Sequence, residues 1–296
     1  MLRGEGSEPN LALDGFVPAK LHAPMIILLL ESFENLKDKL SEDRMREMLA
    51  DPELRVVFAD KPNNPSLLVR WLGAEYSIFL VPTAMPREEF SATLHPSTHN
   101  ASSAQIAEKH RSHVVVSTLS VSPGMGEAIA QSINLILVAN AIGQLFDTPM
   151  GYFWANSGQL RVASEFNQIA ERALEAMIRH GQGDARASDD LPLSFWVGMH
   201  LFSRGSQPVL QTRGLAVFAG HELQIGLVSS SETEKLLHLA NTVAYLFARG
   251  PILTPGETII ELSGQSFEIG LAPTDSTGSP VLMLRPNISN FNEKGP

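Results

Sequence analysis

The fold can be worked out from one stretch near the middle of the chain, Val114-Val-Val-Ser-Thr-Leu-Ser-Val121. Its β-branched residues favour a β-strand. Ser122-Pro-Gly-Met-Gly126 then turns the chain into a long apolar segment that ends near Leu145. Polar residues recur along this segment, so it predicts a helix that is almost completely buried in a globular protein rather than a membrane span. Tyr152-Phe-Trp-Ala155 follows as a short aromatic strand, which completes a strand–helix–strand unit.

A second helix is predicted directly after this unit. We expect Ser164 to cap its start and Gly181 to end it. Between them, apolar residues recur at intervals of three and four, which is the spacing of one buried helix face. The residues expected on that face are Phe166, Ile169, Ala170, Ala173, Leu174, Met177 and Ile178.

Upstream of this unit, Met25–Leu30 is an apolar run that predicts a buried strand. It is far shorter than the roughly 20 residues that span a bilayer. We expect a short helix at 86–90 and a polar loop at 95–103. Further strands are predicted at 54–59, 67–72 and 77–81.

Downstream, three runs separated by turn residues predict an antiparallel meander, at 193–202, 209–219 and 223–228. Gly214 lies inside the second run, where a glycine usually marks a bulge or a close backbone approach. Ser231-Glu-Thr-Glu234 has the spacing of a capping box and predicts the start of a helix. The last predicted strands are 258–262, 267–271 and 281–284.

These elements predict a mixed α+β fold, with mixed and antiparallel sheets, packed helices and two halves of similar size. Residues 1–20 are expected to form a flexible leader and 21–180 an N-terminal α/β half. Residues 181–190 are small, polar and acidic, and are expected to form a linker. Residues 191–296 would then form an antiparallel sheet with a helix, either separately or as one compact unit with the first half.

Composition excludes several classes of protein. Of the 296 residues, 44% are hydrophobic and 18% charged, which excludes a disordered or low-complexity chain. The formal net charge of −10 disfavours nucleic acid and anionic membranes as partners and allows a basic protein. The chain has no cysteine, which excludes disulfides, thiolate metal sites and a cysteine nucleophile. The N-terminus lacks the apolar core of a secretory signal, so we expect a cytoplasmic protein.

Known catalytic motifs are absent: the sequence has no P-loop, no G-x-S-x-G elbow and no H-E-x-x-H pair. Gly124-Met-Gly126 follows a strand and opens a helix, as a dinucleotide-binding turn does, but the third glycine position is Ile129, so a plain tight turn is the favoured interpretation. His110 and His113 are three residues apart, a spacing that could place two metal ligands together on a helix. On a strand, however, a separation of three places them on opposite faces, and locally bonded histidines are the alternative. We expect no bound cofactor and no metal ion.

Three further groups allow both a chemical and a structural interpretation. Glu222, next to His221, could act as a general acid or base, or could stabilise a turn. The cluster Tyr152-Phe-Trp154 could stack on a ligand, or could fill the core. Glu165 lies in the first turn of its helix, where a negative charge favours the helix dipole, and that role is sufficient for it.

Five segments of the chain resemble the bacterial family catalogued as domain of unknown function 4261. The resemblance covers roughly half of the chain and implies a cytoplasmic bacterial α/β protein, with no catalytic residues to carry over. Proteins of this kind occur beside secreted toxins, including type VI secretion effectors, where they can act as immunity proteins. The segments are His113-Val-Val-Val-Ser, Tyr152-Phe-Trp-Ala-Asn-Ser, Phe195-Trp-Val-Gly-Met, Thr212-Arg-Gly-Leu-Ala-Val-Phe-Ala-Gly-His-Glu-Leu and Gly250-Pro-Ile-Leu-Thr-Pro-Gly-Glu-Thr-Ile.

The favoured function is therefore a non-enzymatic immunity protein that neutralises a basic nuclease toxin by direct contact. The acidic charge would steer such a partner. Two alternatives remain open: an enzyme of unrecognised type with Glu222 or a histidine in a cleft, and a regulatory module with a small-molecule pocket. The residues expected to contact the partner are acidic and predicted to be exposed: Asp184, Asp189, Asp190, Glu31, Glu34 and Asp38.

Overall fold

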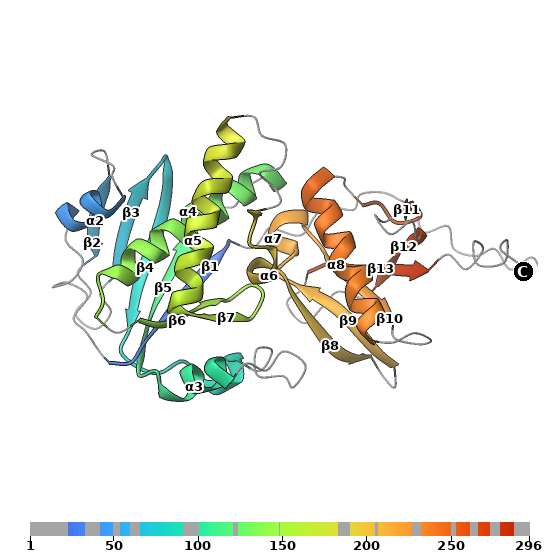
Figure 1. The fold of residues 1–296 in the computed structure, drawn as a ribbon, viewed down its shortest axis with the longest axis horizontal. Helices are drawn as coiled ribbons and strands as arrows, with labels where there is room; N and C mark the ends of the chain where they lie inside the picture. Colours follow the sequence, from blue (N-terminus) through green and yellow to red (C-terminus); the bar gives the residue numbers. More distant parts are fainter. Residues whose placement is uncertain are drawn as a thin grey trace, which may run out of the picture.

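A computed structural model shows a mixed α+β fold built on two sheets that lie side by side (Figure 1). The first sheet has the strand order β2-β3-β4-β5-β1-β6-β7 and is antiparallel throughout. The second has the order β11-β12-β13-β10-β9-β8, with one parallel pair, β10 and β13. The structure describes residues 23–32, 42–49, 54–59, 66–90, 101–120, 124–147, 149–182, 190–204, 207–226, 232–249, 253–260, 266–272 and 279–286.

The first sheet carries the N-terminal half. Its strands are β1 (Met25–Leu30), β2 (Arg55–Ala59), β3 (Ser66–Trp71), β4 (Ala74–Val81), β5 (Ser112–Thr118), β6 (Pro149–Trp154) and β7 (Gln159–Val162). The helices of this half are α2 (Glu42–Leu49), η1 (Arg87–Phe90), α3 (Ala101–Lys109), α4 (Met125–Gln144) and α5 (Ala163–Gly181).

The central strand β1 is apolar throughout because both of its faces are covered. Ile26 and Leu28 belong to the large core beneath α4 and α5. Ile27 and Leu29 face the other way and pack in a smaller cluster with residues of η1 and α3. The prediction of a buried strand at Met25–Leu30 is confirmed.

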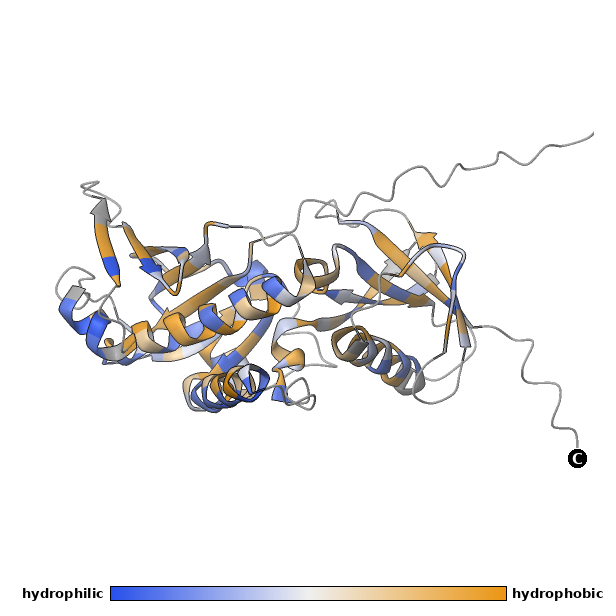
Figure 2. Ribbon diagram, turned by 90° about the horizontal axis from the view of Figure 1, so that it is seen from above, coloured by the Kyte–Doolittle hydropathy of each residue, from blue (hydrophilic) through white to orange (hydrophobic). Residues whose placement is uncertain are grey.

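The predicted strand–helix–strand unit is also confirmed, with β5, α4 and β6 in that order. Both strands run antiparallel to β1, which lies between them, so they are parallel to each other without being neighbours. Figure 2 shows α4, α5 and α8 on the same side of the two sheets.

Burial of α4 is less complete than its sequence predicts. Gly126 and Glu127 in its first turn are exposed, whereas from Ser132 to Gly143 every side chain is buried or half-buried. By length and composition α4 could cross a membrane, but half of the apolar stretch is buried inside the protein, as in the core helix of a globular protein.

The second sheet carries the C-terminal half, and its first three strands form the predicted antiparallel meander. Its strands are β8 (Gly198–Arg204), β9 (Gln207–Arg213), β10 (Glu222–Gly226), β11 (Thr258–Ile260), β12 (Ser266–Ala272) and β13 (Val281–Pro286). The helices are α6 (Leu193–Trp196), α7 (Ala216–Ala219) and α8 (Glu232–Arg249).

Four local predictions are wrong. The run 193–202 is not one strand, because Leu193–Trp196 forms the short helix α6 that inserts Trp196 into the core. The run 209–219 is interrupted in the same way by α7. Helix α3 begins at Ala101, inside the loop predicted at 95–103, and residues 95–100 of that loop lie outside the described part of the chain. The fourth error concerns α5, whose N-cap is Val162 rather than Ser164.

The two halves share one hydrophobic core. Trp196 of α6 stacks on Phe218 of α7 with ring centroids 5.1 Å apart and lies 6.2 Å from the ring of Trp154 in β6. Phe195, the neighbour of Trp196 in α6, packs edge-to-face on Phe166 of α5 and on Trp154 of β6. These aromatic contacts connect the first sheet to the second, and the cluster Tyr152-Phe-Trp154 fills the core on both faces of β6.

Candidate functional site

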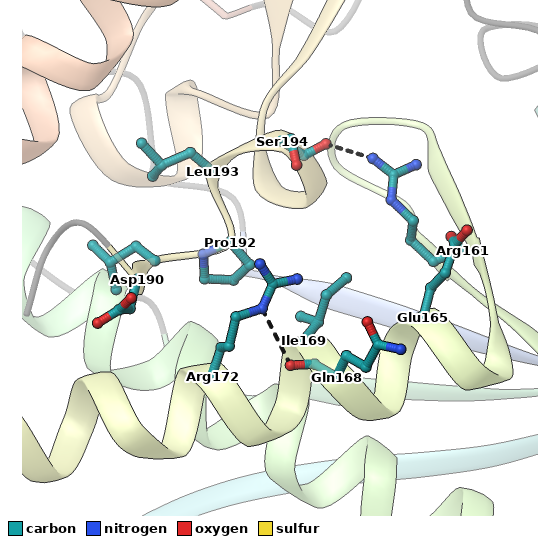
Figure 3. A pocket seen from close by; sticks show the side chains of 10 residues that line it. Arg161, Glu165, Gln168, Ile169, Arg172, Asp190, Pro192, Leu193 and Ser194 are labelled. Atoms are coloured by element: carbon teal, nitrogen blue, oxygen red, sulfur yellow. Dashed lines mark hydrogen bonds between the residues drawn. The ribbon is translucent and has the colours of Figure 1, made fainter.

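A groove lies between α5 and the segment that leads into α6 (Figure 3). Its volume is about 320 Å³. One wall is the start of α5 with the end of β7, and the other is the chain from Asp190 to Ser194. The lining residues are Arg161, Glu165, Gln168, Ile169, Arg172, Asp190, Leu191, Pro192, Leu193 and Ser194.

Arg161 joins the two walls of the groove. Its Nη2 donates to the carbonyl oxygen of Ser194 at 3.0 Å, and its Nη1 donates to the carbonyl oxygen of Leu160 at 3.1 Å. Burial lowers the pKa of this guanidinium, and the negative charge of Glu165 opposes that shift. Arg161 therefore holds the α6 segment in place and brings a positive charge to one end of the groove.

Arg172 lies toward the other end of the groove, on the exposed side of α5. Its Nε donates to the carbonyl oxygen of Gln168 at 3.4 Å (Figure 3), and both Arg172 and Pro192 line the groove. The groove thus offers hydrogen-bond donors and acceptors around a small apolar floor. Ser194 is the only residue with a side-chain hydroxyl among the lining residues, and the charged side chains of the lining are Arg161, Glu165, Arg172 and Asp190.

Glu222 is buried, with 3% of its surface exposed, and its carboxylate organises a turn. Thr212 Oγ1 donates to Oε2 at 2.6 Å, and the backbone N–H of Gly214 donates to Oε1 at 2.8 Å. The N–H groups of Leu215 and Ala216, at the start of α7, donate to the same carboxylate at 3.2 and 3.1 Å. Four donors are more than enough to hold a buried carboxylate, so the turn-stabilising interpretation accounts for Glu222.

Gly214 is required where this turn meets the first half. Its φ is +98°, and an added Cβ would lie 2.3 Å from the carbonyl oxygen of Trp196 and 3.0 Å from Ser157 Cβ. Ser157, in the turn between β6 and β7, is itself fully buried and donates to the carbonyl oxygen of Phe195 at 2.7 Å. The predicted close backbone approach at Gly214 is confirmed.

The histidines singled out in the sequence are buried in structural positions. Met85 N–H donates to His110 Nε2 at 2.8 Å, and His113 Nδ1 lies 2.9 Å from the carbonyl oxygen of Thr83. Both rings therefore anchor the chain that follows β4. His221 lies beside Glu222 in the other half, where burial lowers its pKa to about 4 against a hydrogen bond with the Ala219 backbone.

The Gly124-Met-Gly126 turn does not have the geometry of a dinucleotide site. Neither glycine has a positive φ, and an added Cβ at either position would meet no atom within 4 Å. The preceding strand, β5, also belongs to an antiparallel sheet, whereas dinucleotide-binding turns follow parallel strands. A plain strand-to-helix turn explains these glycines.

Of the six residues predicted to contact a partner, the structure describes two, Glu31 and Asp190. Glu31 is exposed directly after β1. Asp190 is half-buried, and its Oδ2 forms an ion pair with Arg179 Nη1. Asp190 therefore holds the end of α5 as well as lining the groove. Glu34, Asp38, Asp184 and Asp189 lie outside the described residues.

The groove and its arginines are not predictable from the sequence. Arg161 and Arg172 carry no motif, and they meet Ser194 only because α6 folds back onto the start of α5. The one available signal was the polar side of α5, which is exposed along its length.

Among the residues that the structure describes, no three histidine, aspartate or glutamate side chains lie close enough together to hold a metal ion. No protein-family model, curated protein or solved structure matches the chain.

Proposed function

We propose that this protein is a cytoplasmic, non-enzymatic binding protein that neutralises a secreted toxin by direct contact. The toxin would be a basic nuclease effector of a type VI secretion system. The resemblance to domain of unknown function 4261 supports this proposal, and so does the net charge of −10, which would steer a basic partner.

The observation that carries the non-enzymatic part of the proposal is the position of Glu222. An enzyme built on the expected residues would need Glu222, His221 and His110 to converge in an open cleft. Glu222 is instead enclosed by four hydrogen bonds, and His110 is buried in the other half at the end of α3. The residues that could have performed acid–base chemistry hold the fold together.

The test uses a toxin encoded next to this protein. Cells that express the toxin are expected to survive only when this protein is co-expressed, and the two purified proteins are expected to elute as one complex in size-exclusion chromatography. A catalytically inactive toxin allows the complex to be purified without killing the host. Failure of both protection and co-elution would overturn the proposal, and turnover of a small substrate by the isolated protein would support an enzyme instead.

A further inference from the structure

Two apolar side chains that the sequence pattern assigns to the buried face of α5 lie in solvent. Leu174 is 41% exposed and Ile178 is 51% exposed. They are four residues apart, so they lie one turn apart on the same side of the helix. Ala170, Ala173 and Met177, next to them on the helix surface, are buried or half-buried in the core. The apolar stripe of α5 is therefore wider than the core that covers it.

This pair differs from the other exposed apolar residues that the structure describes. Single exposed leucines or valines are normal on protein surfaces. Leu174 and Ile178 are the only two of these residues that share one helix or strand, and together they make a continuous apolar patch. The others are scattered: Val57, Leu72, Leu119, Phe202, Leu237 and Leu271.

Carboxylates border the patch on the side away from the core. Glu171 and Glu175 are both exposed, and each lies three residues before one of the two apolar side chains. Neither carboxylate forms a hydrogen bond or ion pair with any described residue, whereas the guanidinium of Arg179 on the same helix pairs with Asp190. Two like charges four residues apart repel each other, so these carboxylates do not stabilise the helix through each other.

We infer that the outer face of α5, formed by Glu171, Leu174, Glu175 and Ile178, is the surface that docks a basic protein partner. This inference rests on the proposed function and names the place where it is carried out. Leu174 and Ile178 would supply the apolar anchors at the centre of the interface, which carry most of the affinity in protein complexes. Glu171 and Glu175 would attract the basic partner and raise the rate of association.

The anchors are tested with Leu174→Ser and Ile178→Ser, singly and combined, in the full-length protein with the inactive toxin. The combined variant is expected to weaken the complex at least about tenfold, mainly through faster dissociation. Leu237→Ser is the matched control, because Leu237 is 59% exposed and belongs to a different helix, α8. Its loss is expected to leave the affinity within about twofold. Unchanged melting temperatures show that all variants are folded.

The charges are tested by Glu171→Lys combined with Glu175→Lys, with Glu127→Lys on the exposed first turn of α4 as control. At low salt the double reversal is expected to slow association at least about fivefold, and the control to leave it near the wild-type rate. The difference between the two is expected to shrink as salt rises.

The outcomes separate the inference from the proposed function. Wild-type affinity in every α5 variant would overturn the assignment of this face while the immunity function stands. Absence of a complex with the wild-type protein would overturn both. If light scattering shows a dimer of this protein that Leu174→Ser dissociates, the face binds a second copy and the docking assignment is wrong.

Discussion

The turn between β9 and β10 and the outer face of α5 both carry glutamates, and they use them in opposite ways. In the turn, Glu222 is buried and accepts hydrogen bonds from Thr212, Gly214, Leu215 and Ala216. On α5, Glu171 and Glu175 are exposed beside two apolar side chains. Enclosure by donors marks a carboxylate that builds the fold, and exposure beside an apolar patch marks one that is available to a partner.

The largest effect is expected from Gly214→Val. A β-branched residue at φ +98° is strained, and its Cβ would collide with the backbone of Trp196 and with Ser157, where the halves meet. We expect a loss of at least about 4 kcal/mol in the free energy of unfolding, measured by urea denaturation.

Gly226→Val is the control for this substitution, because Gly226 ends β10 with an ordinary φ and no atom within 4 Å of an added Cβ. Valine is favoured in strands, so a change below about 0.5 kcal/mol is expected there. A stable Gly214→Val variant that loses only partner binding would place Gly214 in a binding site instead.

The next effect in size is expected from Glu222→Gln. Glutamine offers one acceptor oxygen and turns two donor hydrogens toward backbone N–H groups that need acceptors. We expect a loss of about 3 kcal/mol, because buried donors are left without partners. Glu268→Gln, at an exposed position in β12, is the control. If the two variants are equally stable, the turn does not depend on this carboxylate.

A smaller effect is expected from pH, through His221. Its pKa is lowered to about 4 in the folded protein, so protonation favours the unfolded chain, where histidine has its ordinary value near 6.5. The stability it supports is complete above the unfolded pKa and is lost as the pH falls toward the folded one. Between pH 7 and pH 5 the wild type should lose about 2 kcal/mol more than His221→Asn. Equal losses in the two proteins would show that His221 is not held neutral.

Much of the fold could be predicted because it depends on local pattern. The apolar run Met25–Leu30 lies in the middle of a sheet covered on both faces. The β-branched residues from Val114 onward indicate the strand β5, although it begins two residues earlier, and Gly181 ends α5 as predicted. The short helix α7 could not be predicted from local pattern. It starts where the backbone N–H groups of Gly214 and Ala216 donate to the carboxylate of Glu222, which lies eight and six residues later in the chain.

The surface of α5 shows why a site is harder to predict than a fold. Periodicity correctly identifies the apolar residues of this helix, but it cannot say how much of a wide stripe the neighbouring elements cover. The helical spacing therefore predicts that Leu174 and Ile178 are buried, whereas both side chains are exposed in the structure. The role of Asp190 is equally hard to predict. Its acidic, polar sequence neighbours predict an exposed carboxylate that is available to a partner, but in the folded chain this carboxylate forms an ion pair with Arg179.

The smallest effect is expected from Glu171→Gln, which tests the exposed side of the comparison. The carboxylate of Glu171 makes no hydrogen bond or ion pair with a described residue, and Glu175 carries a like charge one turn away. Removing its charge should therefore change the free energy of unfolding by less than about 0.5 kcal/mol, in the stabilising direction, because the repulsion is relieved. Urea denaturation at low salt measures this change.

The same variant should slow association with a basic partner, since the charge of Glu171 acts on the rate of encounter rather than on the stability of the fold. A clear loss of stability in Glu171→Gln would mean that this carboxylate, like Glu222, serves the structure.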